Sequence, residues 1–482
     1  MEAKSGAQIS RKAFLQSAGI LILLIVASGI LTQALPSGAF QRSIIDGRET
    51  ILPGTFTFTD KAEYPFWRWI TAPLEVLGSA DGLTIIVIIL FLLMVGAAFA
   101  VLDSCGILRE GISRIVARVG TRKYLLLWAV SFFFMFVGAF FGIFEEVIPM
   151  VPIIVALALS MGWDSLVGLG MSILAVNMGF STAISNPFTI GVAQKLAGLP
   201  LFSGAGLRLV FFVITYLVFM LFLTGYAKKV ERDPHRSPVY AEDNAQAFRL
   251  NKVEKSQAVG TLRFKPAVLW FGVFMAMIAF VLVSAPFLPA IADYSLPIVA
   301  VLFLLAGLGA GFLSGAKTSN VLQAAWQGME RIALGIPLIL MASSIKFIIA
   351  QGGVLDTILF HASSLLSGVS PMTAALAVYG LALLIEFFIG SGSAKAFLLM
   401  PLLIPLANMV GLTSQTAVTA YCFGDGFSNL VYPTNPVLHI ALGLTVVSYG
   451  KWLRWSLKLW ALILPLTVFF LALAVAVNFG PF

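Results

Sequence analysis

Long apolar runs alternate with short polar breaks along almost the whole chain. Many windows hold about 20 nearly continuous apolar residues, the length of a helix that crosses a hydrocarbon core of about 30 Å. This pattern predicts about nine membrane spans, two of which contain polar residues near their middle. The predicted spans cover 14–35, 82–104, 164–197 (broken), 207–227, 267–288, 295–315, 333–351, 412–447 (broken) and 454–476.

Two further apolar stretches, 124–160 and 371–410, are too long for one span. Each is interrupted by a polar segment that contains glycine, Phe-Phe-Gly-Ile-Phe-Glu-Glu at 140–146 and Phe-Phe-Ile-Gly-Ser-Gly-Ser at 387–393. Backbone that is not helical at membrane depth must be covered by protein or line a water-filled cavity. We therefore expect two re-entrant helical hairpins, each entering and leaving on the same side of the membrane.

The two halves of the chain repeat one pattern. Three pairs of matching segments lie 247 residues apart: 94–108 with 341–355, 140–146 with 387–393, and 179–181 with 426–428. The last pair is followed in each half by an Asn-Pro step. Apolar helices that are interrupted at corresponding positions of two repeats indicate a transporter binding site near the bilayer midplane.

Cations in the short loops predict the orientation of the chain. The stretch 106–123 carries five cations and has apolar residues at helical spacing, which predicts an amphipathic helix on the cytoplasmic surface. The linker 228–266 carries nine cations, and 451–458 carries three more. These segments place the N-terminus in the cytoplasm and the C-terminus outside the inner membrane. Span 267–288 has no partner in the first half, so the second repeat is inverted.

The repeats suggest five regions along the chain. In each half we expect two regions. The first holds scaffold helices and an interfacial arm, and the second holds a hairpin, a broken helix and one more span. The linker joins the two halves. The corresponding boundaries are 1–123, 124–227, 228–266, 267–370 and 371–482.

Composition agrees with an all-α polytopic membrane protein. Hydrophobic residues make up 59% of the chain and charged residues 11%, against about 25% charged residues in soluble domains. The net charge of +8 resides at span ends, and no basic stripe with exposed aromatics indicates nucleic acid. The two cysteines, Cys105 and Cys422, are expected to be reduced and buried. The expected partners are a small-molecule substrate and membrane lipid.

Glu145 and Glu146 form the first polar group, at the first hairpin tip. A carboxylate at membrane depth is costly and normally faces a cavity or a partner. If a helix restarts after Gly142, both acids lie in its first turn, where the helix dipole favours negative charge. The pair suits a cation or an ammonium group, and a hydrated or structural role is the alternative.

The second polar group is Ser391-Gly392-Ser393-Ala394-Lys395 at the second tip. Free N–H groups at a helix start bind a carboxylate, and Lys395 adds a positive charge. One alternative is a Ser N-cap with Lys395 reaching toward the interface. Another is an ion pair between Lys395 and Glu386, which ends the preceding arm.

The two helix breaks supply the remaining candidates. Proline frees a backbone carbonyl one turn earlier, and such carbonyls, with Asn, Ser and Thr oxygens, bind Na⁺ at broken transporter helices. Simple kinks are the alternative. The expected ion ligands are Asn177, Ser181, Ser185, Asn186, Asp425, Ser428 and Asn435. The expected substrate ligands at the breaks are Asn186, Thr189, Asn429, Thr434 and Asn435, beside Glu145, Glu146, Ser391, Gly392, Ser393 and Lys395 at the tips. For Lys346, within span 333–351, a scaffold contact is favoured over a site role.

These motifs resemble the YfcC family, which belongs with the C4-dicarboxylate anaerobic carriers and arginine–ornithine antiporters of the ion-transporter superfamily. The resemblance rests on 141–149, 179–188, 391–396, 424–429 and 433–435, and it covers nearly the whole chain. It implies a homodimeric elevator-type fold with a fixed scaffold domain and a moving transport domain. Family members often have glycine where this chain has Ala394, so the second tip departs from the pattern.

The sequence therefore favours a secondary active transporter for a small carboxylate-bearing metabolite, without cofactor other than Na⁺ or H⁺ as the coupling ion. The acidic tip and the antiporter relatives favour an amino acid, with a basic one as a candidate, whereas Lys395 and the dicarboxylate carriers favour an organic anion. A channel is disfavoured because no ring of charges lines the predicted spans. An enzyme is disfavoured because no catalytic constellation is present, and no ATP-binding Gly-x-x-x-x-Gly-Lys loop occurs.

Overall fold

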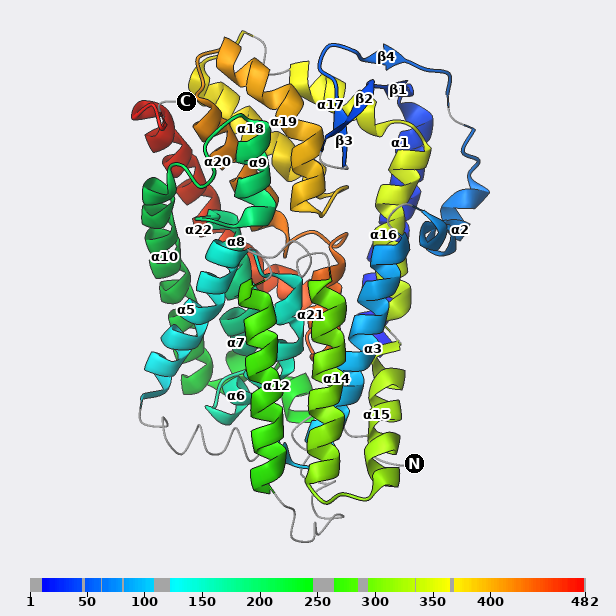
Figure 1. Cartoon of the computed structure of the whole chain (residues 1–482), viewed down its shortest axis with the longest axis vertical. Coiled ribbons are helices and arrows are strands. Elements are labelled where there is room, and N and C mark those ends of the chain that lie inside the picture. Colours follow the sequence, from blue (N-terminus) through cyan, green and yellow to red (C-terminus); the bar gives the residue numbers. More distant parts are fainter. Residues whose placement is uncertain are drawn as a thin grey trace.

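The computed structural model shows a bundle of helices in which two groups of helices can be separated by their contacts (Figure 1). It describes residues 11–45, 48–61, 63–79, 82–107, 122–245, 264–284, 294–333, 335–364 and 368–480. Most of the predicted amphipathic helix at 106–123 falls outside the described residues, as does the part of the linker from 246 to 263.

The first group contains apolar helices and the amphipathic helix α15, which contact one another in pairs, with α3 against α14 and α15, α12 against α14, and α1 against α16. These helices occupy the right and lower parts of Figure 1. Their bounds are α1 (Arg11–Ala34), α3 (Gly82–Ser104), α12 (Phe264–Ser284), α14 (Ser295–Leu313), α15 (Thr318–Ala333) and α16 (Ile336–Gln351).

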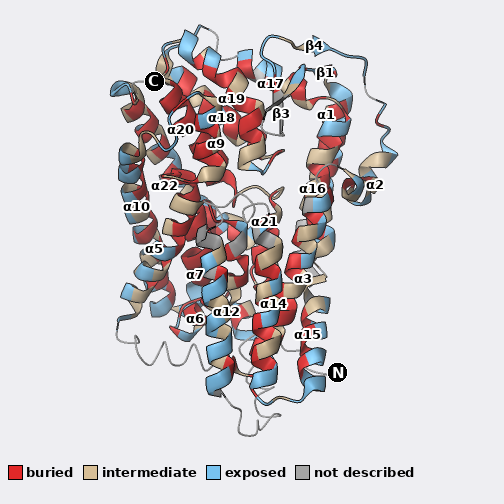
Figure 2. Ribbon diagram, viewed as in Figure 1, coloured by how far each residue is buried: buried red, intermediate tan, exposed pale blue. Residues whose placement is uncertain are grey.

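The second group surrounds two helices, α8 and α20, that are buried along their whole length (Figure 2). A helix that is apolar and buried on all sides forms the centre of a bundle. The members are α5 (Lys123–Phe141), η3 (Glu145–Met150), α6 (Val151–Ser160), α7 (Ser165–Leu169), η4 (Gly170–Leu174), α8 (Ala175–Thr182), η5 (Pro187–Gly191), α9 (Val192–Leu196), α10 (Ala205–Arg232), α18 (Pro371–Glu386), α19 (Gly392–Met409), α20 (Ser414–Ser428), α21 (Pro436–Gly443) and α22 (Tyr449–Ala476).

The apolar stretches 124–160 and 371–410 both return to the end at which they start. At the start of α5, Lys123 Nζ donates to the carbonyl of Met161, just beyond α6, at 3.3 Å. At the start of α18, Pro371 lies 3.8 Å from the Cβ position of Gly411, just beyond α19. The hairpin α5–η3–α6 lies in the lower half of Figure 1 and α18–α19 in the upper half. The two hairpins thus reach the middle of the bundle from opposite ends.

Both predicted broken spans are interrupted at their Asn-Pro steps. The first runs through α7, η4 and α8, breaks at 183–186 and resumes as η5 and α9; the second runs through α20, breaks at 429–435 and resumes as α21. By length and composition, six helices of the described residues can cross a membrane, or seven if α16 and α17 (Leu355–Ser364), bent by 75°, form one span. Shorter apolar helices lie in the other predicted spans and arms, and the count of nine stays a prediction.

Small elements that the sequence reading did not anticipate cover the upper end of the molecule. Strand β1 (Gly38–Ala39) pairs antiparallel with β4 (Thr57–Phe58), and β2 (Arg42–Ile45) pairs antiparallel with β3 (Arg48–Ile51). Arg42 forms an ion pair of 2.9 Å with Asp356 in α17. Helix α2 (Trp67–Glu75) and the short turn η1 (Val76–Gly78) lead into α3.

Candidate functional site

The first hairpin tip is built directly on the first helix break. Gly142 ends α5 in the left-handed conformation, with φ of 69°. A Cβ atom on Gly142 would lie 2.2 Å from Asn186 Oδ1, so only glycine fits here. Ser185 also donates its backbone N–H to the carbonyl of Ala139 at 3.2 Å, and its hydroxyl to the carbonyl of Phe140 at 3.1 Å.

The two acids of this tip begin the helical turn η3, as the sequence predicts for a helix that restarts after Gly142. The side chain of Glu145 is exposed. The side chain of Glu146 lies outside the described part of the structure. The first tip thus carries a carboxylate that solvent can reach.

Asn186 caps the helix that follows the first break. Its Oδ1 accepts hydrogen bonds from the backbone N–H groups of Phe188 at 2.9 Å and Thr189 at 3.3 Å. Asn186 Nδ2 and Thr189 Oγ1 are buried and have no hydrogen-bond partner among the described residues. Asn186 Nδ2 can therefore donate to a ligand, and Thr189 Oγ1 can donate to one or accept from one.

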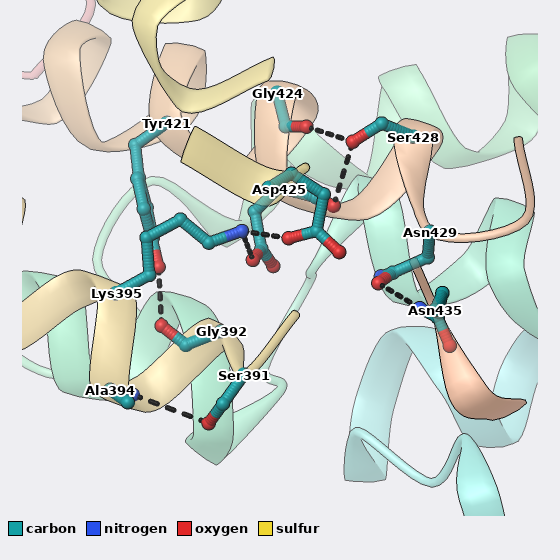
Figure 3. A network of polar contacts seen from close by, with 11 residues as sticks. Ser391, Gly392, Ala394, Lys395, Tyr421, Gly424, Asp425, Ser428, Asn429 and Asn435 are labelled. Atoms are coloured by element: carbon teal, nitrogen blue, oxygen red, sulfur yellow. Dashed lines mark hydrogen bonds and ion pairs between the residues drawn. The ribbon is translucent and has the colours of Figure 1, made fainter. Parts of the chain in front are cut away.

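At the second break, an asparagine again caps the helix that follows. Asn435 Oδ1 accepts from the N–H of Val437 at 2.9 Å, and Asn435 Nδ2 donates to Asn429 Oδ1 at 3.0 Å (Figure 3). Ser428 donates its hydroxyl to the carbonyl of Gly424 at 2.7 Å, within its own helix. Thr434 is half-buried beside Asn435.

The second tip meets the first break. Ser391 caps α19, accepting from the N–H of Ala394 at 3.5 Å. A Cβ atom on Gly392 would lie 2.7 Å from Thr189 Cγ2 and 2.9 Å from Asp425 Oδ2. The hydroxyl of Tyr421 donates to the carbonyl of Gly392 and ties the tip to α20. Ser393 is half-buried in the first turn.

Contacts between the two halves are crossed. The first tip, η3, packs against α21, the helix that follows the second break, whereas α19 behind the second tip packs against η5 and α9, which follow the first break. Between them, α8 and α20 cross where a Cβ atom on Gly426 would lie 2.4 Å from Ser181 Cα. All four predicted interruptions are therefore brought together around one crossing point.

Lys395 does not present a free charge to this region. Its side chain is fully buried, and its ammonium group forms an ion pair with Glu386 and another, at 2.6 Å, with Asp425 Oδ1. The ion pair of Lys395 with Glu386, an alternative offered by the sequence, is present, and burial rules out a lysine that reaches toward the interface. Asp425 is the second partner of Lys395, and its predicted role as an ion ligand stays a prediction.

The remaining predicted ion ligands lie along α8. Ser181 donates its hydroxyl to the carbonyl of Asn177 at 2.6 Å, one turn earlier in the same helix. Both polar side-chain atoms of Asn177 are buried without a hydrogen-bond partner among the described residues. Asn177 thus retains its full capacity to bind, whereas the hydroxyl proton of Ser181 is already used.

Arg208 in α10 was not among the predicted site residues. It is fully buried, and its guanidinium donates to the carbonyls of Ala183 and Ile184, each at 3.0 Å, and of Ser203 at 2.7 Å. Arg208 therefore holds the carbonyls that the first break leaves without helical partners. The sequence could have indicated this role, because Arg208 is a charged residue inside the apolar segment 205–227.

A second cluster missing from the predictions joins the start of the linker to α7. Asp243 accepts from the N–H of Ser165 at 3.0 Å and from its hydroxyl at 2.5 Å. Asp164 accepts from the hydroxyl of Ser237 at 2.6 Å. Burial raises the pKa of Asp243 to about 6, despite these hydrogen bonds.

A family model for the C4-dicarboxylate anaerobic carrier, DcuC, matches residues 14–476. The chain belongs to the C4-dicarboxylate anaerobic carrier family. It is similar to YfcC of Escherichia coli (strain K12), a candidate basic amino acid antiporter, with 30% identity over 466 residues that cover 90% of this chain and 91% of that protein. An uncharacterized protein of Haemophilus influenzae is 26% identical over 378 residues, 77% of this chain and 72% of that one.

Two solved structures show more distant similarity. The YdaH transporter of Alcanivorax borkumensis has a TM-score of 0.42 and 18% identity, covering 97% of this chain and all of that one. MtrF of Neisseria gonorrhoeae, described within a class of antimetabolite efflux pumps, has a TM-score of 0.39 and 16% identity, covering 96% and 95% of the two chains. The family membership and the apolar helices make this chain an integral membrane protein of a transporter family.

Proposed function

We propose that this protein is a secondary active transporter that moves a small carboxylate-bearing amino acid across the inner membrane, in exchange for or together with an ion. The crossed contact of two hairpin tips with two helix breaks carries this proposal. Discontinuous helices that meet in the middle of a bundle expose helix ends to a common site, as in transporters with repeats. The predicted Na⁺ or H⁺ coupling belongs to the same proposal.

An elevator mechanism fits the two groups of helices. In this proposal the group around α8 and α20 moves, and the group of α1, α3, α12 and α14–α16 stays fixed. The groups meet where α16 packs on α21 and α14 packs on η3. Leu92 and Ile339 of the fixed group and Ile440 of the moving group line a crevice there, with about 310 Å³ of empty space. Apolar side chains on both faces of this crevice suit a sliding contact.

We infer that the two halves are inverted repeats and that the transporter is a homodimer. The 247-residue spacing and the two hairpins that enter from opposite ends support the inversion. The homodimer follows from the family resemblance. The cytoplasmic N-terminus and the outward C-terminus follow from the distribution of cations in the loops.

A basic amino acid is the favoured substrate. The positive charge of Lys395, which supports an anionic substrate in the sequence, is matched by two carboxylates, so it offers no net attraction for a dicarboxylate. Glu145 is exposed at the first tip, where it can meet an ammonium or guanidinium group. The name of the Escherichia coli relative points the same way. The alternative, a C4-dicarboxylate carrier, is favoured by the description of the family.

Counterflow in proteoliposomes tests the proposal. Purified protein is reconstituted with internal arginine, and uptake of labelled arginine, ornithine and a C4-dicarboxylate is compared with uptake into empty vesicles. We expect saturable uptake of the basic amino acids that requires internal substrate or an ion gradient. Uptake of the dicarboxylate alone would replace the amino-acid assignment by the alternative. Flux without saturation would indicate a channel and contradict the transporter.

Within this assay, Glu145→Gln and Glu146→Gln test the first tip. If one of these acids binds the cationic end of the substrate, its neutralisation should raise the apparent KM for arginine by about tenfold or more, because a charge-assisted contact is worth roughly 1.5–3 kcal/mol. The uptake of a neutral amino acid, if any is carried, should change much less.

A further inference from the structure

The three charged residues behind the second tip do not balance one another. Glu386 ends α18, Lys395 lies in the first turn of α19, and Asp425 lies in α20. Their side chains are 1%, 0% and 1% exposed. Figure 3 shows the Lys395 ammonium directed at the carboxylate oxygens beside it. When all three groups are ionised, this buried triad carries one negative charge in excess.

Among the described residues, no further cation forms an ion pair with either carboxylate of the triad. Glu386 Oε1 and Asp425 Oδ2 are buried and have no hydrogen-bond partner among the described residues. The other titratable groups near the triad are three tyrosines and one cysteine, which are neutral hydroxyl or thiol groups, and the guanidinium of Arg208 is directed at backbone carbonyls. The four neutral groups are Tyr379, Tyr421, Cys422 and Tyr432.

An uncompensated carboxylate in the interior of a membrane protein is strongly unfavourable. The triad is therefore stable only when it holds one more positive charge. A proton requires no additional space, and either carboxylate can take it. A metal ion would require several oxygen ligands around it, and no group of three or more acidic, His or Cys side chains suited to a metal ion occurs in the described part of the chain.

The triad also lies close to the surface of the tip. Gly390 and Ser391 are exposed. The Cβ position of Gly390 is 3.7 Å from Glu386 Oε1, the oxygen without a partner. Only glycine backbone therefore separates this oxygen from the outside of the tip. On the other side, Asp425 touches the Cβ position of Gly392, which also meets Thr189 of the first break.

We propose that Glu386, Lys395 and Asp425 form a binding site for one exchangeable proton behind the second tip, and that the transporter takes up and releases this proton as it cycles. The part that concerns the cycle rests on the proposed transport function. In the loaded state one carboxylate is a neutral acid and the other forms the ion pair with Lys395. Release of the proton leaves the triad with its excess negative charge, which a cationic substrate at the tip then compensates.

Direct proton titration tests the site without any transport. The full-length protein in detergent is titrated in choline chloride, between pH 9 and pH 6, and the protons bound by wild type and variants are compared. Glu386→Gln and Asp425→Asn each leave one carboxylate paired with Lys395, so each should bind about one proton fewer per chain than wild type. The double variant Glu386→Gln/Lys395→Gln leaves a carboxylate without a cation, and it should regain that proton.

Glu75→Gln is the matched control. Glu75 is also paired with a cation, Arg68, at 2.5 Å, but it lies in α2, away from the candidate site. The hydrogen bond from the Arg68 guanidinium holds the pKa of Glu75 below its usual range, so its loss should not change proton binding in this pH interval. Equal titration of wild type, Glu386→Gln and Glu75→Gln would overturn the proposal.

Two further experiments show whether the site binds a proton or Na⁺, and whether the bound ion affects transport. If sodium chloride in place of choline chloride abolishes the difference between wild type and Glu386→Gln, the site binds Na⁺ and the proton assignment is overturned. In proteoliposomes, a pH gradient should change the rate of arginine uptake by wild type but not by Glu386→Gln. If the titration shows the proton while arginine does not move, the proton site is supported and the proposed substrate fails.

Discussion

The contact between the first tip and the first break can be tested with a single methyl group. Gly142→Ala forces an alanine into the left-handed conformation, which costs about 1–2 kcal/mol. Its Cβ atom would lie 2.2 Å from Asn186 Oδ1 and 2.8 Å from Phe188 Cδ2, and overpacking of this kind costs a further 1–3 kcal/mol, roughly. We expect the variant to lose about 2–5 kcal/mol of unfolding free energy.

Gly162→Ala separates the cost of the left-handed conformation from the cost of overpacking. Gly162, just beyond the end of α6, has a similar φ of 83°, but its Cβ position has no atom within 4 Å. Its substitution should therefore cost only the conformational part, about 1–2 kcal/mol. Unfolding of the detergent-solubilised proteins gives both values, and counterflow of arginine gives the functional effect.

The two variants should differ in transport as well as in stability. Displacement of Asn186 disturbs the cap on Phe188 and Thr189, so Gly142→Ala should reduce uptake strongly, while Gly162→Ala should retain it. Equal loss of stability in the two variants would refute the close tip–break contact. Full uptake by Gly142→Ala would refute the role of that contact in transport.

Three further predictions follow from particular contacts. Gly392→Ala should cost about 1–3 kcal/mol of unfolding free energy by overpacking, whereas Gly390→Ala, with its nearest atom at 3.7 Å, should cost less; urea unfolding compares them. Lys395→Met leaves two buried carboxylates unpaired and should cost about 3–5 kcal/mol, whereas Glu386→Gln keeps one ion pair and should cost about 1 kcal/mol; similar losses would contradict the charge count. Burial raises the pKa of Asp243 to about 6. Between about pH 4 and pH 6, Asp243 is therefore protonated when the linker packs on α7 and ionised when the linker is detached. Packing of the linker on α7 should weaken as the pH rises through this interval. Hydrogen exchange of residues 240–245, corrected for the intrinsic rate, should show this trend in wild type and not in Asp243→Asn.

The helices and their interruptions could be predicted because each rests on local sequence. Apolar runs of membrane length predict the helices. The Asn-Pro steps predict the breaks, because proline has no N–H group to continue the helical hydrogen bonds. The tips could be located for the same reason. Gly142 and Gly392 occur where the polar segments interrupt the two hairpins, and both prove to be positions at which a side chain has no space.

The roles of several polar residues depend on tertiary contacts, so the sequence alone misassigned or missed them. Lys395 and Asp425 are 30 positions apart in different helices, and nothing local predicts their ion pair at 2.6 Å. Arg208 binds carbonyls that become available only because the helix breaks at Ala183 and Ile184. The Oδ1 atom of Asn186, predicted as a ligand, accepts hydrogen bonds from two backbone N–H groups, which the sequence does not show.

These contacts also change the electrostatic argument about the substrate. An anion bound at the site would need either an unpaired cation or free N–H groups at a helix start. Arg208 is occupied by backbone carbonyls and Lys395 by two carboxylates. Asn186 and Asn435 already accept hydrogen bonds from the first N–H groups of the helices that follow the breaks.

Behind the second tip, the described residues Glu386, Lys395 and Asp425 offer two carboxylates to one ammonium group. A dicarboxylate would add negative charge beside this triad, whereas a basic amino acid brings two positive groups for its one carboxylate. In the proposed cycle, a proton or the cation of the substrate neutralises this excess. The proposal therefore links the identity of the substrate to the ion with which it is exchanged, because a basic amino acid exchanged against a proton would compensate the same set of residues in both states.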